Sequence, residues 1–366
     1  MTNTPKPSLK RRLLNLVGIS GTTIFLTLFV IELVVRWVPL YPDIFTVYDP
    51  ARGWRNIPNK SGIYLNVGCL GEYRTPVTIN SQGLHDVEHS YDPSADTTRI
   101  TLIGDSLVAA FEVPLEQSAH RQLESLLNAE GNGSYEVIGA GHQGYGTALE
   151  LLFYEQEGRR YQSDIVLLVV EPANDLYDNH PELSAVGAVG YPYFTLDDSG
   201  ELLFHAVEQE VSYDSFPGEH SVNPLHDALY HYSYLYRLLS RRYFWVNSVR
   251  QSTVSSDDYV YYEQAEEVTA ALLARMRDEV TADGARFGVV IAPASPQRRE
   301  ALQATQEWLR GVLDEQGIPY LDLQPAFESD GRSLFFACDV YHWNADGQRF
   351  TAEQEAAFIR TLLNTP

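Results

Sequence analysis

A serine, a histidine and an acid that lie far apart in this chain have the residue types needed for nucleophilic catalysis. Ser106 follows Gly104 and Asp105 in a small, turn-forming triplet, while Asp339 and His342 lie three residues apart near the C-terminus. A serine is a poor nucleophile unless a base takes its proton, and His342 is the candidate base. Asp339 can hold the imidazole in the correct tautomer. The predicted chemistry is attack of Ser106 on a carbonyl carbon.

A tetrahedral oxyanion also needs hydrogen-bond donors, and three candidates follow predicted strands. They are the N–H group of Ser106, the N–H group of Gly141 and the side-chain amide of Asn174. Donors aimed at developing negative charge contribute strongly to such reactions. We expect supporting roles for Gly104, Asp105 and Asp175.

Five short apolar runs alternate with longer helical patterns and must position these residues. The runs are 100–104, 135–141, 164–171, 286–293 and 318–323, and the helices lie near 115–129, 149–157, 262–283 and 296–315. Continuous Val, Ile and Leu strands separated by helices predict an α/β fold with a doubly wound parallel sheet. Ser106, Gly141 and Asn174 follow the carboxyl ends of strands, where open α/β sheets bind ligands, whereas Asp339 and His342 precede the final helix.

The rest of the chain divides by composition. We predict a basic cytoplasmic tail (1–12), a transmembrane anchor (13–38), an irregular lead-in with small strands (39–98) and a catalytic domain (99–366) with an aromatic-rich insertion at about 176–262. A hairpin is expected within residues 191–204.

The N-terminal segment predicts a location at the membrane. Residues 13–31 carry no charge and follow Lys10, Arg11 and Arg12. As a helix they extend roughly 28 Å, enough to cross a bilayer, and the basic flank places the N-terminus in the cytoplasm and the body in the periplasm or outside the cell. A cleaved signal peptide is the open alternative.

Charge and cysteine content exclude other classes. The net charge of −23 disfavours a nucleic-acid partner. Cys69 and Cys338 either pair or remain buried thiols, and no Cys-x-x-Cys motif is present to build a zinc site.

These blocks resemble the SGNH (GDSL-type) hydrolases. Gly104 to Leu107 read GDSL, Gly141 matches the second block, Asn174 in PAND the third, and Asp339 with His342 the last. The resemblance extends from about Tyr48 to the C-terminus, and INSQGLHD and DVYHWNADGQ are similar to a membrane-anchored bacterial subgroup. Pro172 replaces the usual glycine of the third block, and His85 replaces a common arginine. The resemblance implies a three-layer α/β/α flavodoxin-like fold and ester hydrolysis or acyl transfer without a metal or organic cofactor.

We therefore predict a membrane-anchored serine esterase that forms an acyl-enzyme on Ser106 and cleaves short O-acyl esters linked to carbohydrate or lipid. The alternatives are an O-acyltransferase of cell-surface polysaccharide and a non-catalytic binding module of the same fold. A dinucleotide site built on Gly139, Gly141, Gly144 and Glu171 is a further hypothesis, although it leaves the other candidate residues unexplained. The substrate and the oligomeric state stay open.

Overall fold

The structure is a computed structural model of the 366-residue chain. It describes all residues except 1–7, 38–41, 67–70, 130, 132, 184–190, 207–223, 241–257 and 365–366. The chain divides into two units, one formed by Met1–Tyr41 with Asn223–Arg250 and the other by Pro42–Val222 with Gln251–Pro366.

A five-stranded parallel sheet organises the larger unit. Its strands are β5 (Thr97–Gly104), β6 (Ser134–Gly141), β7 (Ile165–Val170), β10 (Arg286–Ile291) and β11 (Tyr320–Asp322). They lie in the order β11-β10-β7-β5-β6, so the chain reverses its direction of travel across the sheet between β6 and β7. This is the flavodoxin-like strand order, and the predicted α/β class is confirmed.

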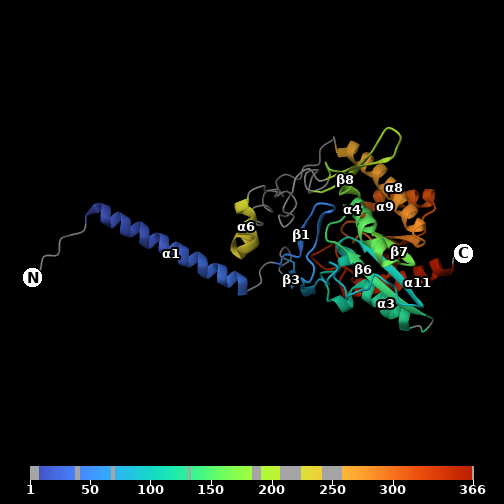
Figure 1. Ribbon diagram of the computed structural model, residues 1–366, viewed down its shortest axis with the longest axis horizontal. Coiled ribbons are helices and arrows are strands. Elements are labelled where there is room, and N and C mark those ends of the chain that lie inside the picture. Colours follow the sequence, from blue (N-terminus) through green and yellow to red (C-terminus); the bar gives the residue numbers. More distant parts are fainter. Residues whose placement is uncertain are drawn as a thin grey trace, which may run out of the picture. The chain divides into compact units, whose positions relative to one another are not determined.

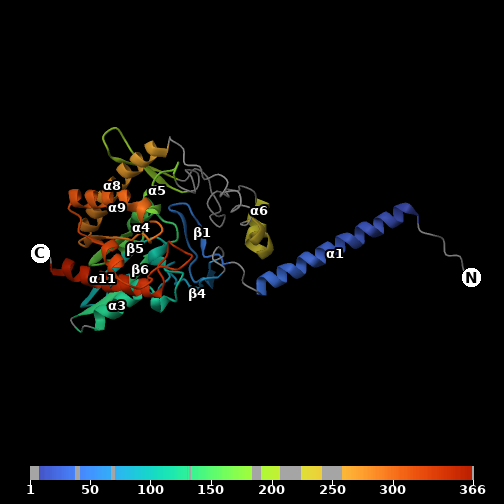
Figure 2. The same ribbon diagram turned by 180° about the vertical axis from the view of Figure 1, so that it is seen from behind.

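Helices cover both faces of this sheet (Figure 1). On one face lie α4 (Thr147–Gln156), α8 (Asp258–Ala282) and α9 (Arg299–Gln316). On the other lie α2 (Ser106–Ala109), α3 (Ala119–Ala129), α10 (Gln324–Ser329) and α11 (Ala345–Asn364), and α3 and α11 lie side by side in both views (Figure 2). The short helices η1 (Leu115–Gln117), η2 (Gly158–Tyr161) and α5 (Asn174–Tyr177) complete the connections.

The central strand β7 shows why these strands read as unbroken apolar runs. Val166, Leu168 and Val170 belong to the core under α4 and α8, whereas the alternate residues Ile165 and Val169 belong to the core under α3 and α11. Successive side chains of a strand point to opposite faces, so a strand covered on both faces must be apolar throughout.

Antiparallel strand pairs precede and interrupt the sheet. In the lead-in, β1 (Thr46–Asp49) pairs with β2 (Gly53–Asn56), and β3 (Ser61–Leu65) pairs with β4 (Arg74–Thr78). The expected hairpin is present as β8 (Tyr193–Leu196) and β9 (Leu202–His205).

The smaller unit contains α1 (Leu9–Trp37), α6 (Pro224–Tyr232) and a further helical segment at 234–240. The length and apolar composition of α1 are sufficient for it to cross a membrane. The predicted insertion at 176–262 is thus divided, because α6 groups with α1 while β8 and β9 group with the sheet.

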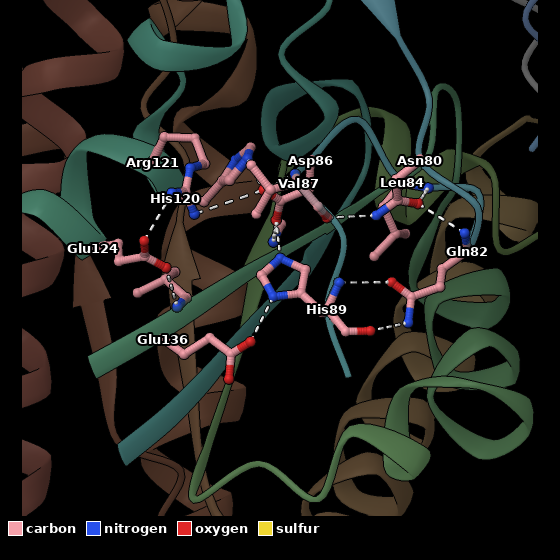
Figure 3. A network of polar contacts seen from close by, with 12 residues as sticks. Asn80, Gln82, Leu84, Asp86, Val87, His89, His120, Arg121, Glu124 and Glu136 are labelled. Carbon is pink, nitrogen blue, oxygen red and sulfur yellow. Dashed lines mark hydrogen bonds and ion pairs between the residues drawn. The ribbon is translucent and has the colours of Figure 1, made fainter. Parts of the chain in front are cut away.

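A buried polar network joins the lead-in to the sheet (Figure 3). Asp86 has no exposed side-chain surface, and its Oδ2 accepts hydrogen bonds from the N–H of Gly139 at 2.8 Å and from His89 at 3.1 Å. The other ring nitrogen of His89 lies 2.7 Å from Glu136 Oε1. Burial raises the pKa of Asp86, but the neighbouring His120 and His89 outweigh this and hold it well below its usual range.

Replacing Asp86 by alanine is expected to destabilise the fold by about 3–5 kcal/mol, because it leaves His89 and the Gly139 N–H without their buried acceptor. The free energy of unfolding from urea denaturation measures the loss. The exposed Asp92→Ala variant is the control and should stay within about 0.5 kcal/mol of the parent. Equal stabilities for the two variants would contradict the structural role of the network.

Candidate active site

The predicted nucleophile lies in a tight turn between β5 and α2. Asp105 precedes the helix, and its Oδ1 accepts a hydrogen bond from the N–H of Leu107 at 2.8 Å. Ser106 is the first residue of this four-residue helix. Ala110 then ends it in the left-handed conformation, with φ of 49°. The turn places the Ser106 hydroxyl at the carboxyl edge of the sheet.

The structure brings Ser106, His342 and Asp339 together in hydrogen-bonded sequence. Nε2 of His342 lies 2.9 Å from Ser106 Oγ, and Nδ1 lies 2.8 Å from Asp339 Oδ2. The second oxygen of Asp339 accepts hydrogen bonds from the backbone N–H groups of Tyr341 and His342. The acid is therefore fixed by its own loop and is pointed at the imidazole.

Two lead-in residues that sequence analysis missed hold this loop. Glu72 accepts hydrogen bonds from the N–H groups of Ala337, Cys338 and Asp339. Tyr73 donates its hydroxyl hydrogen bond to Asp339 Oδ2 at 2.8 Å. The sequence offered one signal for this contact, because Cys69 lies just before Glu72 and Cys338 lies just before Asp339. In the structure Cys338 is disulfide-bonded, and Cys69 lies outside the described residues.

Acids dominate the electrostatics of the histidine. Burial lowers the pKa of His342, but the negative charge of Glu112 and the hydrogen bond to Asp339 outweigh it and raise the pKa to about 9. Burial raises the pKa of Asp339, whereas the hydrogen bonds from His342 and Tyr73 bring it down to about 2. The surroundings therefore favour an imidazolium beside an ionised Asp339.

The predicted amide donor lies next to the nucleophile turn. Nδ2 of Asn174 donates to Asp105 Oδ2 at 3.0 Å, and the same carboxylate oxygen lies 3.5 Å from Ser106 Oγ. Burial raises the pKa of Asp105 to about 6, while hydrogen bonds from Leu107 and Asn174 oppose the rise. In this resting arrangement the amide is bonded to Asp105, so it must share or exchange that bond to reach an oxyanion.

The predicted glycine donor packs directly against the nucleophile helix. A Cβ on Gly141 would lie 2.0 Å from the backbone nitrogen of Ala109, and a Cβ on Gly104 would lie 2.5 Å from a methyl group of Val108. Only glycine at these two strand ends lets α2 approach the sheet this closely.

Asp175, for which the sequence predicted a supporting role, is fully buried, and its Oδ2 accepts a hydrogen bond from the N–H of Glu171 at 2.8 Å. Burial and the nearby Glu150 and Asp105 raise the pKa of Asp175 well above its usual range.

Residues of the dinucleotide hypothesis have other contacts in the structure. Glu171 accepts hydrogen bonds from the N–H groups of Ala173 and Asn174 and pairs with Arg298 at 2.8 Å. A Cβ on Gly139 would lie 2.6 Å from the ring of His120. Helix capping and close packing thus account for both positions.

Within the described ranges, no group of three or more His, Cys, Asp or Glu side chains could hold a metal ion. The residues that converge at the sheet edge are suited to proton transfer and nucleophilic attack on a carbonyl compound.

Comparison with known proteins gives a family match. A profile described as the GDSL-like Lipase/Acylhydrolase family matches residues 102–350. No curated protein matches the sequence significantly.

Several solved structures are similar to this chain. An acetyl xylan esterase, AlAXEase, is 15% identical with a TM-score of 0.40, covering 71% of this chain and 98% of that one. The psychrotrophic esterase EstA from Pseudoalteromonas sp. is 13% identical with a TM-score of 0.41, covering 73% and 100%. A lipase/acylhydrolase from Enterococcus faecalis is 13% identical with a TM-score of 0.42, covering 72% and 96%.

Gly141→Ala is expected to destabilise the protein by about 1–3 kcal/mol, because the added methyl group must displace α2. Gly311→Ala is the matched control, since that glycine lies in α9 with no atom within 4 Å of an added Cβ. It should stabilise the protein by about 0.5–1 kcal/mol. Thermal unfolding of both variants measures the opposite signs, and a neutral Gly141→Ala variant would refute the close packing.

Proposed function

Because this chain belongs to the GDSL-like lipase/acylhydrolase family, we propose that it is a serine esterase cleaving short O-acyl esters on carbohydrate or lipid. The observation that carries the proposal is the pair of hydrogen bonds that His342 makes, one with Ser106 at 2.9 Å and one with Asp339 at 2.8 Å. A hydroxyl, a base and an orienting acid within hydrogen-bond reach are the arrangement that nucleophilic acyl transfer requires.

The proposed reaction begins when Ser106 Oγ attacks the ester carbonyl and its proton passes to Nε2 of His342. Asp339 orients the ring and stabilises the imidazolium. The N–H groups of Ser106 and Gly141 and the amide of Asn174 stabilise the oxyanion. The imidazolium then protonates the departing alcohol, which leaves an acyl group on Ser106. Water, activated by the same nitrogen, attacks this ester, and the acid is released with Ser106 restored.

We also propose that α1 is retained as a membrane anchor with the catalytic domain on the outer side. Glu32, near the end of α1, accepts hydrogen bonds from the Ser233 hydroxyl at 2.8 Å and from the N–H groups of Tyr234 and Leu235 at 3.0 and 2.9 Å. Arg36 pairs with the same carboxylate at 2.8 Å. These contacts support retention, because removal of α1 would leave the start of the 234–240 helix without its cap.

Ser106→Ala is expected to lower kcat for short-chain aryl esters by at least about 10³-fold, because the hydroxyl forms the acyl-enzyme. Initial rates of the full chain in detergent measure the loss. Ser125→Ala is the control, since this exposed hydroxyl bonds only to the Arg121 carbonyl among the described contacts, and its rates should match the parent. Equal turnover by parent and Ser106→Ala would exclude this nucleophile.

The acceptor of the acyl group is settled in the same reactions. Free acid and acylated sugar are quantified after an oligosaccharide is added to the ester donor. Accumulation of free acid supports the hydrolase. Acylated sugar that the parent forms and Ser106→Ala does not form would identify an O-acyltransferase. Ligand binding without turnover in any assay would instead indicate a binding module.

The retained anchor predicts that protein recovered from cell membranes still contains α1. Intact mass of the purified protein checks this, and alkaline extraction should leave it in the membrane pellet. A mature N-terminus located after Trp37 would show that the segment is a cleaved signal peptide. Glu32→Gln should remain in the membrane but expose the 234–240 segment to limited proteolysis, because the charged acceptor is lost.

A further inference from the structure

A third acid, which has no part in the mechanism above, faces the catalytic histidine. Glu112 lies in the turn that follows α2, just after the left-handed residue Ala110. Its carbonyl accepts a hydrogen bond from the Thr75 hydroxyl at 2.9 Å, and the carbonyl of Ala109 lies 2.8 Å from Nδ1 of His85. Two residues of the lead-in therefore hold the backbone of this turn.

The side chain of Glu112 is only 1% exposed, and its Oε1 lies 3.5 Å from Nε2 of His342. That oxygen has no hydrogen-bond partner within the described part of the chain. The same Nε2 lies 2.9 Å from Ser106 Oγ. One ring nitrogen thus faces both the nucleophile and a buried carboxylate.

Charge compensation is what stabilises the ionised form of Glu112 at this position. A buried acid is costly unless a cation or donor faces it, and the imidazolium of His342 is the cation at hand. Burial raises the pKa of Glu112 above its usual range, and the charge of His342 limits that rise.

The other groups that face the imidazole are also acids or neutral donors. Asp339 contacts Nδ1 from its own loop, Tyr73 donates to that acid from the lead-in, and Asp105 acts from the start of α2. Glu112 Oε1 lies 3.5 Å from Nε2 itself, the nitrogen on which a proton must be absent for catalysis.

We propose that Glu112 is a positioning residue that holds a proton on Nε2 of His342, in competition with Ser106, and so sets the pH at which the histidine becomes a base. The Nε2 proton must pass to solvent before the ring can accept the proton of the Ser106 hydroxyl. The consequence for turnover rests on the proposed esterase function, whereas the consequence for the histidine does not. Activity should therefore require alkaline conditions.

The test compares pH profiles of kcat/KM for the parent, Glu112→Gln and the exposed control Glu116→Gln. In the parent, we expect the rising limb above pH 8. Glu112→Gln keeps the shape of the side chain but removes its charge. The rising limb of its kcat/KM profile should therefore lie at least one pH unit lower than that of the parent, and its kcat/KM at pH 7 should be about tenfold higher. Glu116→Gln should retain the parental profile. A limb that does not move in Glu112→Gln overturns the proposal.

Two further measurements keep the test independent of folding and of the ester used. Nitrogen NMR of the histidine rings should show His342 titrating near pH 9 in the parent and lower in Glu112→Gln, whether or not any ester is cleaved. Absence of ester turnover by the parent, together with this NMR shift between parent and Glu112→Gln, would overturn the esterase proposal and retain the inference. Glu112→Asp keeps a carboxylate and should restore a limb close to the parental one. If Glu112→Gln does not fold, an NMR titration midpoint of His342 in the parent within the ordinary range of about 6–7 overturns the proposal.

Discussion

His342 makes hydrogen bonds through both ring nitrogens, and each bond reaches a different part of the chain. Nε2 contacts Ser106 in the turn after β5, and Nδ1 contacts Asp339 on the same loop as the histidine. Glu72 and Tyr73 of the lead-in bind this loop by hydrogen bonds. The bond between Nε2 and Ser106 joins residues 236 positions apart, so it forms only when the folded sheet holds the turn after β5 next to the C-terminal loop. The order β11-β10-β7-β5-β6 places β5 inside the sheet. The nucleophile turn is therefore supported by neighbouring strands on both sides.

The layered fold could be predicted because its cause is local in the sequence. A strand covered by helices on both faces must be apolar at every position, and β7 is buried along its full length. The parallel arrangement also predicted that the polar residues just after the strands, and the pair that precedes the final helix, would lie at one edge of the sheet. Ser106, Asn174, Asp339 and His342 do lie at one edge of the sheet, although their chemical roles remain a proposal.

The remaining site residues could not be predicted because their contacts depend on the path of loops. Three of them, Glu72, Tyr73 and Glu112, lie outside the alternating apolar pattern of the strands and helices and outside the four sequence motifs of the family. Tyr73 and Asp339 are 266 residues apart, and only the folded lead-in brings them together. The division of residues 176–262 between two units could not be predicted either. Apolar composition indicates that a segment is buried, but it does not indicate which other segment covers it.

Under the proposed mechanism, the order of these residues along the chain also controls when activity can arise. Ser106 is made early, and the imidazole that it needs follows 236 residues later. At the pace of ribosomal synthesis this separation amounts to roughly 10–50 seconds. Under the proposed mechanism, the hydroxyl has no base during that interval, and the growing chain cannot attack an ester. The proposed activity therefore becomes possible only once the C-terminal segment, with Asp339 and His342, has been synthesised and folded.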